Sequence, residues 1–419
     1  MLSSTNLIPR TLTFMLAGGN GKRLRPLTLN RPKPLVPFCG VFRLIDFTLS
    51  NCVNSNLKNV YPLIQHKHAS LQQYMETAAA NPNGPFCRKQ SPSLICLPPK
   101  PGRIYAGTAD AVFQNIWLLE RERPAFVLIV AADHVYKMDY FQLLRFHADS
   151  GADLTVAAVE HPKTMANTFG VLQVSPANEV LAFEEKPSDP KPMSANPNVS
   201  LVSMGIYVFN TGALIRALIE DGWRTNSDHD FGRNVIPAVI GSLQVCAYNF
   251  TAAARNTASY WRDVGTIENY YQSQMELLLV NSPFDPYNEA LSPTYAFGES
   301  DHVTSPLGDL CNRNSVLDSV VSRRSTILGA RIVRSVISRG VHVETSAEIE
   351  SSVLLPGVRI GRGARIRRAV IEENAEIPEC AEIGYESATD RQQFHVSSGG
   401  VVVVPSASFV ASACARTAF

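Results

Sequence analysis

Residues Phe14–Gly40 combine glycines, basic side chains and prolines in the order FMLAGGNGKRLRPLTLNRPKPLVPFCG. Gly18, Gly19 and Gly21 lie close together, directly after a short apolar run. Such glycines allow backbone N–H groups to turn toward a phosphate, and the guanidinium of Arg23 can add positive charge. The alternative is a tight turn between a strand and a helix, with solvated basic residues. These residue types therefore indicate an anion site, and the question is whether the anion is only bound or also reacts.

Two familiar phosphate-binding motifs do not fit this loop. A P-loop requires Ser or Thr after its Gly–Lys pair, where this chain has Arg23, and glycine where Leu16 stands. The dinucleotide fingerprint requires glycine at the position of Leu24. The loop is thus compatible with phosphate binding but is not either of these two motifs.

Two aspartates could hold a metal ion against phosphate. Asp133 comes directly after the apolar run FVLIVAA, and Asp263 lies among aromatic residues in YWRDVGT. Mg²⁺ is usually held by one or two carboxylates together with phosphate oxygens, and this pair could supply them. Taken singly, each aspartate has a structural alternative, such as a helix N-cap for Asp133. The neighbouring His134 suits a structural role as well as it suits a role in the site.

A carboxylate and an amine lie side by side at Glu185 and Lys186, just before Pro187. An acceptor next to a cationic donor suits a ligand that carries both hydroxyls and phosphate, such as a sugar phosphate. An ordinary charged turn before proline is the alternative.

The elements that must position these residues alternate between strand and helix patterns. Strands are expected at 12–16, 125–133, 153–159 and 203–209, and helices at 109–122, 138–151 and 267–279. Helix-like sequence is also expected after the glycine loop. This alternation indicates an α/β domain whose ligands lie at the carboxyl ends of the strands, where Gly18 and Asp133 fall.

The pattern changes in the last third of the chain. Residues 280–301 are rich in Pro, Asn, Ser and Asp and read as a linker. From about Leu307, aliphatic and small residues recur as in ILGARI and VLLPGVRIGRGARI. Hexapeptide-like repeats of this kind predict a parallel β-helix, whereas a β-sandwich would show wider turn spacing. The frequent arginines, as in RIGRGARIRR, are expected on its outer face, where they could pair with acidic groups or bind an anionic effector. The expected domains are 1–284, a linker at 285–306, and 307–419.

Composition argues against several classes of partner and of bound metal. The 419 residues carry a net charge of +1, so no global field attracts nucleic acid or an anionic membrane. The eight cysteines form no CxxC pair or zinc-type cluster and are expected to be reduced. No convincing secretion signal and no apolar run of membrane-spanning length is present. We therefore expect a soluble, cytoplasmic protein with no nucleic-acid or membrane partner.

Taken in order, the segments resemble the glucose-1-phosphate adenylyltransferases (ADP-glucose pyrophosphorylases) of bacterial glycogen and plant starch synthesis. The resemblance covers nearly the whole chain. It rests on the segments AGGNGKRLRPLTLNRPKPLVPFCGVFRLIDFTLSN, YAGTADAVFQN, DHVYKMDY, FEEKP, SMGIYVFN, SDHDFGRNVIP and YWRDVGT, and on the terminal repeats. It implies a nucleotidyltransferase domain with a mixed, Rossmann-like (GT-A-like) α/β sheet, followed by a left-handed parallel β-helix.

The resemblance also implies roles for individual residues. It assigns catalysis to Arg23, Lys33, Asp133 and Lys186, and the metal, Mg²⁺, to Asp133 and Asp263. ATP would be bound by Ala17, Gly18, Gly19, Gly21, Gln65, Gly107 and Thr108. Glucose 1-phosphate would be bound by Tyr105, Gly170, Glu185, Lys186 and Ser203. In the implied reaction, a phosphate oxygen of glucose 1-phosphate attacks the α-phosphorus of ATP and pyrophosphate leaves. Positioning and charge neutralisation would supply most of the catalysis.

Small-molecule allosteric effectors and a homotetramer are further implications of the resemblance. Five positions differ from the usual pattern. Ala132 and Asn56 stand where Gly is common, Lys22 replaces a small hydroxyl residue, and Ile104 stands where Trp is common. Asn30 stands where the enteric bacterial enzymes carry a lysine tied to activator binding. Two alternatives remain open, namely a pyrophosphorylase for another nucleotide sugar and a regulatory subunit with weak catalysis. Arg23, Asp133, Lys186 and Asp263 are all present, which favours an active enzyme.

Overall fold

The computed structural model describes residues 7–82, 84–87, 92–253, 259–279, 282, 284–287, 292–298 and 315–406. These residues form two compact units. Unit 1 consists of 7–19, Thr48–Ala132 and Tyr136–Trp261, and unit 2 of Asn20–Phe47, Asp133–Val135 and 262–406. Because the units follow contacts in space rather than chain order, the boundaries expected at 284 and 307 stay a prediction.

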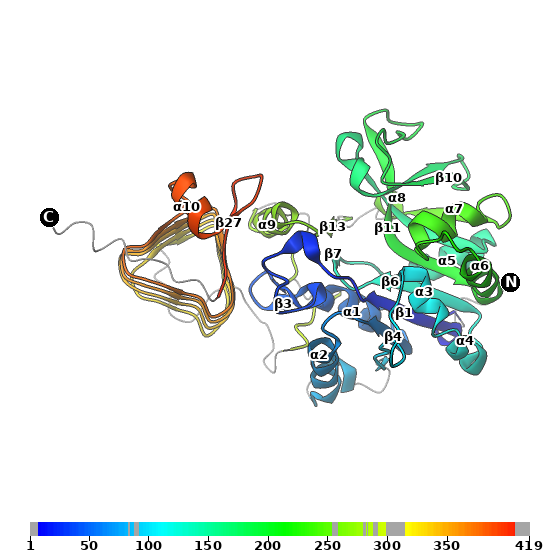
Figure 1. The fold of residues 1–419 in the computed structure, drawn as a ribbon, viewed down its shortest axis with the longest axis horizontal. Helices are drawn as coiled ribbons and strands as arrows, with labels where there is room; N and C mark the ends of the chain where they lie inside the picture. The colour runs from blue at the N-terminus through cyan, green and yellow to red at the C-terminus, as the bar shows by residue number, and fades with distance from the viewer. Residues whose placement is uncertain are drawn as a thin grey trace. The chain divides into compact units, whose positions relative to one another are not determined.

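Unit 1 is built on a nine-stranded mixed sheet (Figure 1). Its main path is β10-β9-β11-β6-β1-β4-β5, and β8 pairs with both β11 and β12. β1 is parallel to β4 and β6, whereas β11 is antiparallel to β6, β8 and β9. The strands are β1 (Thr11–Ala17), β4 (Asn59–Ile64), β5 (Ser93–Leu94), β6 (Phe126–Ala131), β8 (Leu154–Pro162), β9 (Gly170–Val174), β10 (Val180–Glu185), β11 (Val199–Asn210) and β12 (Val245–Asn249). All four strands expected from the sequence are confirmed.

Helices cover both faces of this sheet. On one face, Phe14 of β1 and Ile129 of β6 belong to a buried core that also contains Val112 of α3 and Leu214 of α6. On the other, His147 of α5 shares a hydrogen bond of 2.8 Å with the Thr155 hydroxyl of β8. Across the described residues of both units, the helices are α1 (Leu44–Asn54), α2 (His68–Ala80), α3 (Thr108–Phe113), α4 (Trp117–Glu122), α5 (Tyr140–Ser150), α6 (Thr211–Gly222), α7 (Ile236–Val239), α8 (Phe250–Ala253), α9 (Ile267–Glu276) and α10 (Ser387–Gln393). The last two, α9 and α10, belong to unit 2 and not to the unit that contains this sheet.

Two helix predictions needed correction. The helix expected at 109–122 is divided into α3 and α4, and the side chain of Asn115 between them donates a hydrogen bond to the Ala111 carbonyl. This bond competes with the helical backbone pattern. After the glycine loop, the helical pieces before α1 are the 3₁₀ turns Lys22–Leu24 and Lys33–Leu35, because the prolines of this segment prevent a continuous helix. The helices expected at 138–151 and 267–279 are confirmed, as α5 and α9.

Unit 2 contains the predicted repeats as a parallel β-helix. Seen end-on in Figure 1, its coils trace a triangle, with one ladder of parallel strands along each side. The strands are β14 (Val316–Leu317), β17 (Arg331–Val333), β20 (Glu348–Glu350), β23 (Arg365–Arg367) and β26 (Glu382–Ile383) on one side, β15 (Val320–Val321), β18 (Val336–Ile337), β21 (Val353–Leu354), β24 (Ala369–Ile371) and β28 (Val402–Val404) on the second, and β16 (Thr326–Ile327), β19 (His342–Val343), β22 (Arg359–Ile360) and β25 (Glu376–Ile377) on the third. β27 (His395–Val396) pairs antiparallel with β28.

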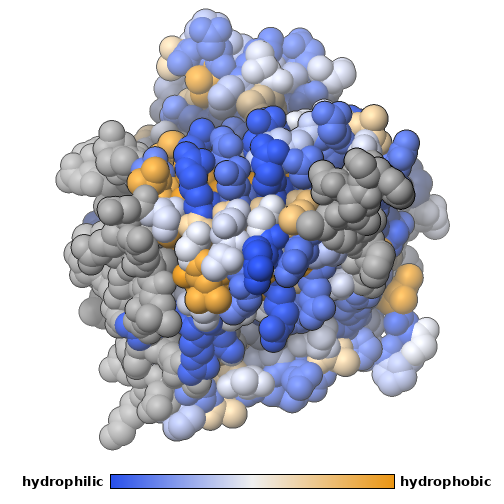
Figure 2. All heavy atoms as spheres, turned by 90° about the vertical axis from the view of Figure 1, so that its left-hand side faces the viewer, coloured by the Kyte–Doolittle hydropathy of each residue, from blue (hydrophilic) through white to orange (hydrophobic). Residues whose placement is uncertain are grey.

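The register of the ladders explains how the coils pack on one another and how charged side chains pair on the outer face. Ile332, Ile349 and Ile366 lie in register on successive coils and are buried, so each coil covers the aliphatic side chains of the next. Outside, Arg365 lies between Glu348 and Glu382 and pairs with both, at 3.5 and 2.6 Å. Figure 2 shows a mostly hydrophilic outer face with small hydrophobic patches.

Unit 2 also includes pieces from the first part of the chain. The short strands β2 (Pro37–Phe38) and β3 (Phe42–Arg43) form a hairpin. β7 (His134–Tyr136) pairs with β13 (Trp261–Asp263), and both strands belong to unit 2 except for Tyr136 and Trp261. Of the expected linker, 285–287 and 292–298 are described, and the Tyr287 hydroxyl donates a hydrogen bond to the Cys39 carbonyl. The rest of the linker and the tail after 406 lie outside the described residues.

None of the helices within the described residues combines the length and the apolar character that crossing a membrane requires.

Candidate functional site

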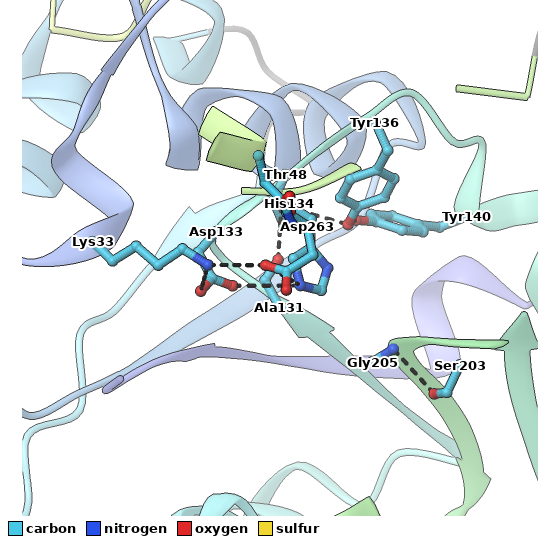
Figure 3. A network of polar contacts seen from close by, with 11 residues as sticks. Lys33, Thr48, Ala131, Asp133, His134, Tyr136, Tyr140, Ser203, Gly205 and Asp263 are labelled. Carbon is cyan, nitrogen blue, oxygen red and sulfur yellow. Dashed lines mark hydrogen bonds and ion pairs between the residues drawn. The ribbon is translucent and has the colours of Figure 1, made fainter. Parts of the chain in front are cut away.

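Lys33 lies between the two aspartates that the sequence singled out. Its Nζ is 2.9 Å from Asp133 Oδ2 and 3.1 Å from Asp263 Oδ1 (Figure 3). Asp133 lies two residues after the end of β6, Asp263 ends β13, and Lys33 begins a 3₁₀ turn whose backbone is stiffened by Pro32 and Pro34. Three residues far apart in the sequence are thus brought to one point of unit 2.

Charge pairing governs the ionisation of this cluster. Burial acts to lower the pKa of Lys33, but the nearby carboxylates of Asp133 and Asp263 outweigh it, and the pKa is raised. Burial acts to raise the pKa of both aspartates, and the Lys33 ammonium outweighs it, so both pKa values are lowered. The cluster therefore holds one ammonium and two carboxylates at neutral pH.

Two further groups lie beside the carboxylates. The His134 Nε2 atom is 3.9 Å from an oxygen of Asp133 and of Asp263. The guanidinium of Arg23 and the carboxylate of Asp263 both lie close to Gly265, where a Cβ would meet them at 3.1 and 3.0 Å. Gly265 thus leaves room for this charged pair, and His134 is a neighbour of the proposed metal ligands.

The two carboxylates fit the chemistry of a magnesium site completed by a ligand. Their side chains are 28% and 17% exposed, so both remain open to a bound molecule. No group of three or more His, Cys, Asp or Glu side chains in the described part of the chain is arranged to hold a metal ion by itself. Two carboxylates are sufficient for Mg²⁺ when phosphate oxygens supply further ligands.

A second group of predicted residues meets at the Gln65 side chain in unit 1. Its amide accepts a hydrogen bond from the Tyr105 N–H and donates one of 3.3 Å to the Tyr105 carbonyl. Gly18 approaches it closely, because a Cβ on this glycine would lie 3.4 Å from the Gln65 Cβ. Gly18, Gln65 and Tyr105 therefore form one small cluster next to the end of β1.

Gly107 and Thr108 lie against the segment 227–232. A Cβ on Gly107 would lie 2.2 Å from the His229 carbonyl oxygen, which allows only glycine without a shift of the backbone. The Thr108 hydroxyl donates to Asp230 Oδ2 at 2.9 Å and accepts from the Phe231 N–H. The buried carboxylate of Asp221 binds His229 Nδ1 at 2.8 Å and so holds this segment in place.

Glu185 and Lys186 form the third group. Lys186 Nζ is 2.7 Å from Glu185 Oε1, and the Lys186 side chain is 44% exposed. Gly170 and Gly232 border the same carboxylate, since a Cβ on either would come within 2.9 Å of Glu185 Oε2. These two glycines leave the carboxylate accessible to a ligand. Ser203 lies at a bulge of β11, where its hydroxyl accepts from the Gly205 N–H at 3.2 Å.

The remaining predicted residues lie in the glycine loop. Ala17 ends β1 and is buried, and a Cβ on Gly19 would meet no atom within 4 Å. Gly21 has φ +62°, a left-handed conformation that favours glycine, and its carbonyl accepts from the Thr28 hydroxyl at 2.8 Å. The structure thus groups Lys33 with both aspartates, Gln65 with Gly18 and Tyr105, Gly107 with Thr108, and Glu185 with Lys186 and Gly170.

Sequence reasoning missed the residues that hold the second and third groups together. Asp230 binds Thr108, Gly232 borders Glu185, and Asp221 orients His229. In the sequence, the segment SDHDFGRN stands out only through the family resemblance. Its crowded Asp, His and Gly residues are the available signal in the sequence, whereas Asp221, near the end of α6, lies outside any motif and offers none.

The mixed sheet, the glycine loop after its first strand and the paired aspartates define the class of protein. The family model for "Nucleotidyl transferase" matches residues 12–279, and that for "GlmU-like, C-terminal hexapeptide" matches 308–404. The chain is therefore a nucleotidyltransferase with a hexapeptide-repeat domain.

Full-length relatives define the family more narrowly. The chain is 42% identical to glucose-1-phosphate adenylyltransferase of Rhodopirellula baltica, over 97% of this chain and 92% of that protein. It is 41% identical to the enzymes of the same name from Methylococcus capsulatus (96% and 94% covered) and Hydrogenovibrio crunogenus (96% of each). The chain belongs to the glucose-1-phosphate adenylyltransferase family.

Proposed function

We propose that this protein joins ATP to α-D-glucose 1-phosphate and releases ADP-glucose and pyrophosphate, the step that forms the sugar donor for glycogen-type α-glucan synthesis. The observation that carries the proposal is the Lys33 ammonium held by Asp133 and Asp263 in a chain that is about 40% identical, over nearly its full length, to relatives of that name. The cluster combines what a reaction between two phosphates needs, namely cations and ligands for a metal.

The reaction makes and breaks one bond at phosphorus. A phosphate oxygen of glucose 1-phosphate bonds to the α-phosphorus of ATP, and the bond from that phosphorus to the bridging oxygen breaks. The electron pair leaves with pyrophosphate. No covalent intermediate with the protein is required, so the task of the protein is to align two anions and to offset their charge.

Asp133 and Asp263 would hold Mg²⁺, which when bound offsets phosphate charge. Lys33, already 2.9 and 3.1 Å from the two carboxylates, would contact the phosphates that are held there, and Arg23 would bind the triphosphate. The N–H groups of Gly18, Gly19 and Gly21 would cradle phosphate oxygens.

In unit 1, each substrate would have its own group of residues. Gln65, Gly107 and Thr108, with Ala17 at the end of β1, would bind ATP. Glu185 would accept hydrogen bonds from sugar hydroxyls, and Lys186 would donate to the sugar phosphate. Tyr105, Gly170 and Ser203 would complete the glucose 1-phosphate site.

Pyrophosphate release by the purified protein tests the proposal. We expect release with glucose 1-phosphate and ATP, and much slower release with UTP, CTP or GTP. A preference for another nucleotide would make the protein a different pyrophosphorylase. Tight binding of ATP without turnover, with or without candidate effectors, would make it a regulatory subunit.

Small-molecule effectors and a homotetramer belong to the same proposal. The β-helix supports the second, since the ends of a stack of coils expose aliphatic side chains unless they are capped or covered by another surface. Sedimentation of the full chain tests the tetramer, and the assay above, repeated with phosphorylated metabolites, tests the effectors.

A further inference from the structure

A cavity of about 600 Å³ lies within unit 2, between α9 and one corner of the β-helix. The helix contributes residues at helical spacing, among them Tyr271 and Met275. The corner contributes Arg334, Ser351 and Arg368. The cavity shares no lining residue with the cluster around Lys33, so it is a separate feature of the molecule.

The corner repeats with the coils of the β-helix. Arg334, Ser351 and Arg368 directly follow β17, β20 and β23, which are neighbours in one ladder. All three have left-handed backbones, with φ of 48°, 46° and 50°. Neighbouring coils are about 4.8 Å apart, so the two arginines start roughly 10 Å apart, with the small Ser351 between them. The serine leaves space between two long cationic side chains.

The walls of the cavity are fastened to each other. The Tyr271 hydroxyl donates a hydrogen bond of 2.7 Å to the Ser351 carbonyl, which ties α9 to the corner. The Glu268 carboxylate accepts from the Gly399 N–H at 3.0 Å and from the Ser398 hydroxyl at 3.1 Å. Arg368 donates to the Gly399 carbonyl at 2.7 Å, which orients its guanidinium, and within the described residues this bond engages only one of its five donors.

The charge of the cavity is positive. Arg334, Arg367 and Arg368 line it, against the carboxylates of Glu268 and Glu350. Glu268 is engaged with the 398–399 turn, whereas none of the three arginines has a carboxylate within ion-pair distance in the part of the chain that the structure describes. The electrostatic balance therefore favours an anion over a neutral ligand.

We propose that this cavity binds the phosphate group of a small metabolite, with Arg334 and Arg368 as its principal contacts. Phosphate suits two guanidinium groups that approach from different coils, because its several oxygens can accept from both at once. A ligand bound here would bridge α9 and the β-helix and would stabilise their contact. The site is distinct from the proposed catalytic residues and does not depend on the proposed reaction.

Inorganic phosphate is the probe for this site. Calorimetric titration of the full chain, without nucleotide or sugar phosphate, should show that Arg334→Ala and Arg368→Ala each weaken phosphate binding about tenfold or more. Arg331→Ala, an exposed arginine of β17 outside the cavity, is the matched control and should bind phosphate as the native chain does. Arg334 is the more informative variant because its side chain makes no hydrogen bond to any other residue that the structure describes.

Hydrogen exchange locates the bound phosphate. In the native chain, phosphate should slow amide exchange in α9 and at 397–401, and Arg334→Ala should abolish that protection. The proposal is overturned if the native chain binds no phosphate, if both cavity variants bind it normally, or if Arg331→Ala weakens binding equally. Protection that appears elsewhere and not at α9 overturns it as well.

Discussion

At the scale of single residues, the most direct prediction concerns the cluster of Lys33, Asp133 and Asp263. Asp263→Asn keeps the size of the side chain but removes a charge that would offset phosphate. We expect the rate of ADP-glucose formation to fall by about a hundredfold or more, as when one important electrostatic group is lost. The measurement is the steady-state rate at saturating ATP, glucose 1-phosphate and Mg²⁺.

Asp149→Asn is the matched control, because Asp149 is an exposed residue of α5 and its only ion pair among the described residues joins it to Arg145 on the same helix. Its rate should equal that of the native protein. Near-native turnover by Asp263→Asn would remove Asp263 from the proposed metal site.

Lys186→Ala tests the sugar-phosphate site. Lys186 is partly exposed and pairs only with the adjacent Glu185 among the described residues, so its amine is available to a ligand. Loss of one charge-assisted contact should raise the KM for glucose 1-phosphate about tenfold to a hundredfold. The KM for ATP should change little. Equal increases for both substrates would indicate that Lys186 has a structural role.

The sequence predicted some of these residues, but it did not predict the contacts between them. Asp133 was found because it follows an apolar run, and a carboxylate at that position falls at the carboxyl end of a buried strand. The contact of Lys33 with both aspartates could not be read from the chain, because the three residues are far apart and their meeting depends on how the proline-rich segment turns. Asp221 was missed for the same reason.

At the scale of elements, the turn before α3 depends on Gly107. A methyl group there would collide with the His229 carbonyl, which accepts from the Ala109 N–H at 2.8 Å. We expect Gly107→Ala to shift this turn and to raise the KM for ATP more than the KM for glucose 1-phosphate. Gly212→Ala, in α6 with its nearest contact at 3.7 Å, is the control and should leave both unchanged.

The segment before the 3₁₀ turn at Lys33 bears on regulation. Asn30 stands where the resemblance places an activator-binding lysine, and Arg31 is already engaged, 2.8 Å from Glu373 and 3.3 Å from Glu372. Arg43 also pairs with Glu373, at 3.4 Å. These carboxylates compete with any phosphate for the same guanidinium groups.

We therefore expect fructose 1,6-bisphosphate to stimulate the enzyme weakly or not at all, and Glu373→Gln to increase the response. The measurement is the initial rate of each protein over a range of fructose 1,6-bisphosphate concentrations. Strong activation of the native protein at micromolar concentration would contradict the prediction.

Element patterns were predicted well where one physical rule dominates. The repeats require aliphatic residues at fixed intervals, and the ladders of Ile332, Ile349 and Ile366 follow that rule. The division between α3 and α4 was not predicted, because the apolar spacing continues across Asn115 while its side chain bonds to the backbone. A hydrogen bond from one side chain to the backbone leaves a weaker signal in the sequence than a periodic pattern of apolar residues does.

At the scale of the whole molecule, the β-helix is joined to earlier parts of unit 2 by specific contacts. Tyr271 binds the Ser351 carbonyl, Glu268 binds the Gly399 N–H, and Arg31 pairs with Glu372 and Glu373. Each contact connects a residue before 280 with one after 350. The repeats are therefore a structural support for the proline-rich segment and α9, which carry or adjoin the proposed catalytic residues.

Removing the repeats tests this dependence. A chain that ends near Pro293 keeps every proposed catalytic residue but loses all coils of the β-helix and the partners of Arg31, Glu268 and Tyr271 in them. Each buried aliphatic side chain contributes about 1.5–3 kcal/mol, and the coils contain many, so the stack is too hydrophobic to be a solvated tail. We expect the fragment to be poorly soluble or dissociated, with weakened activity and regulation. Sedimentation and the pyrophosphate-release assay measure both effects. A monodisperse fragment with tetrameric assembly and native kinetics would show that the β-helix is an accessory domain.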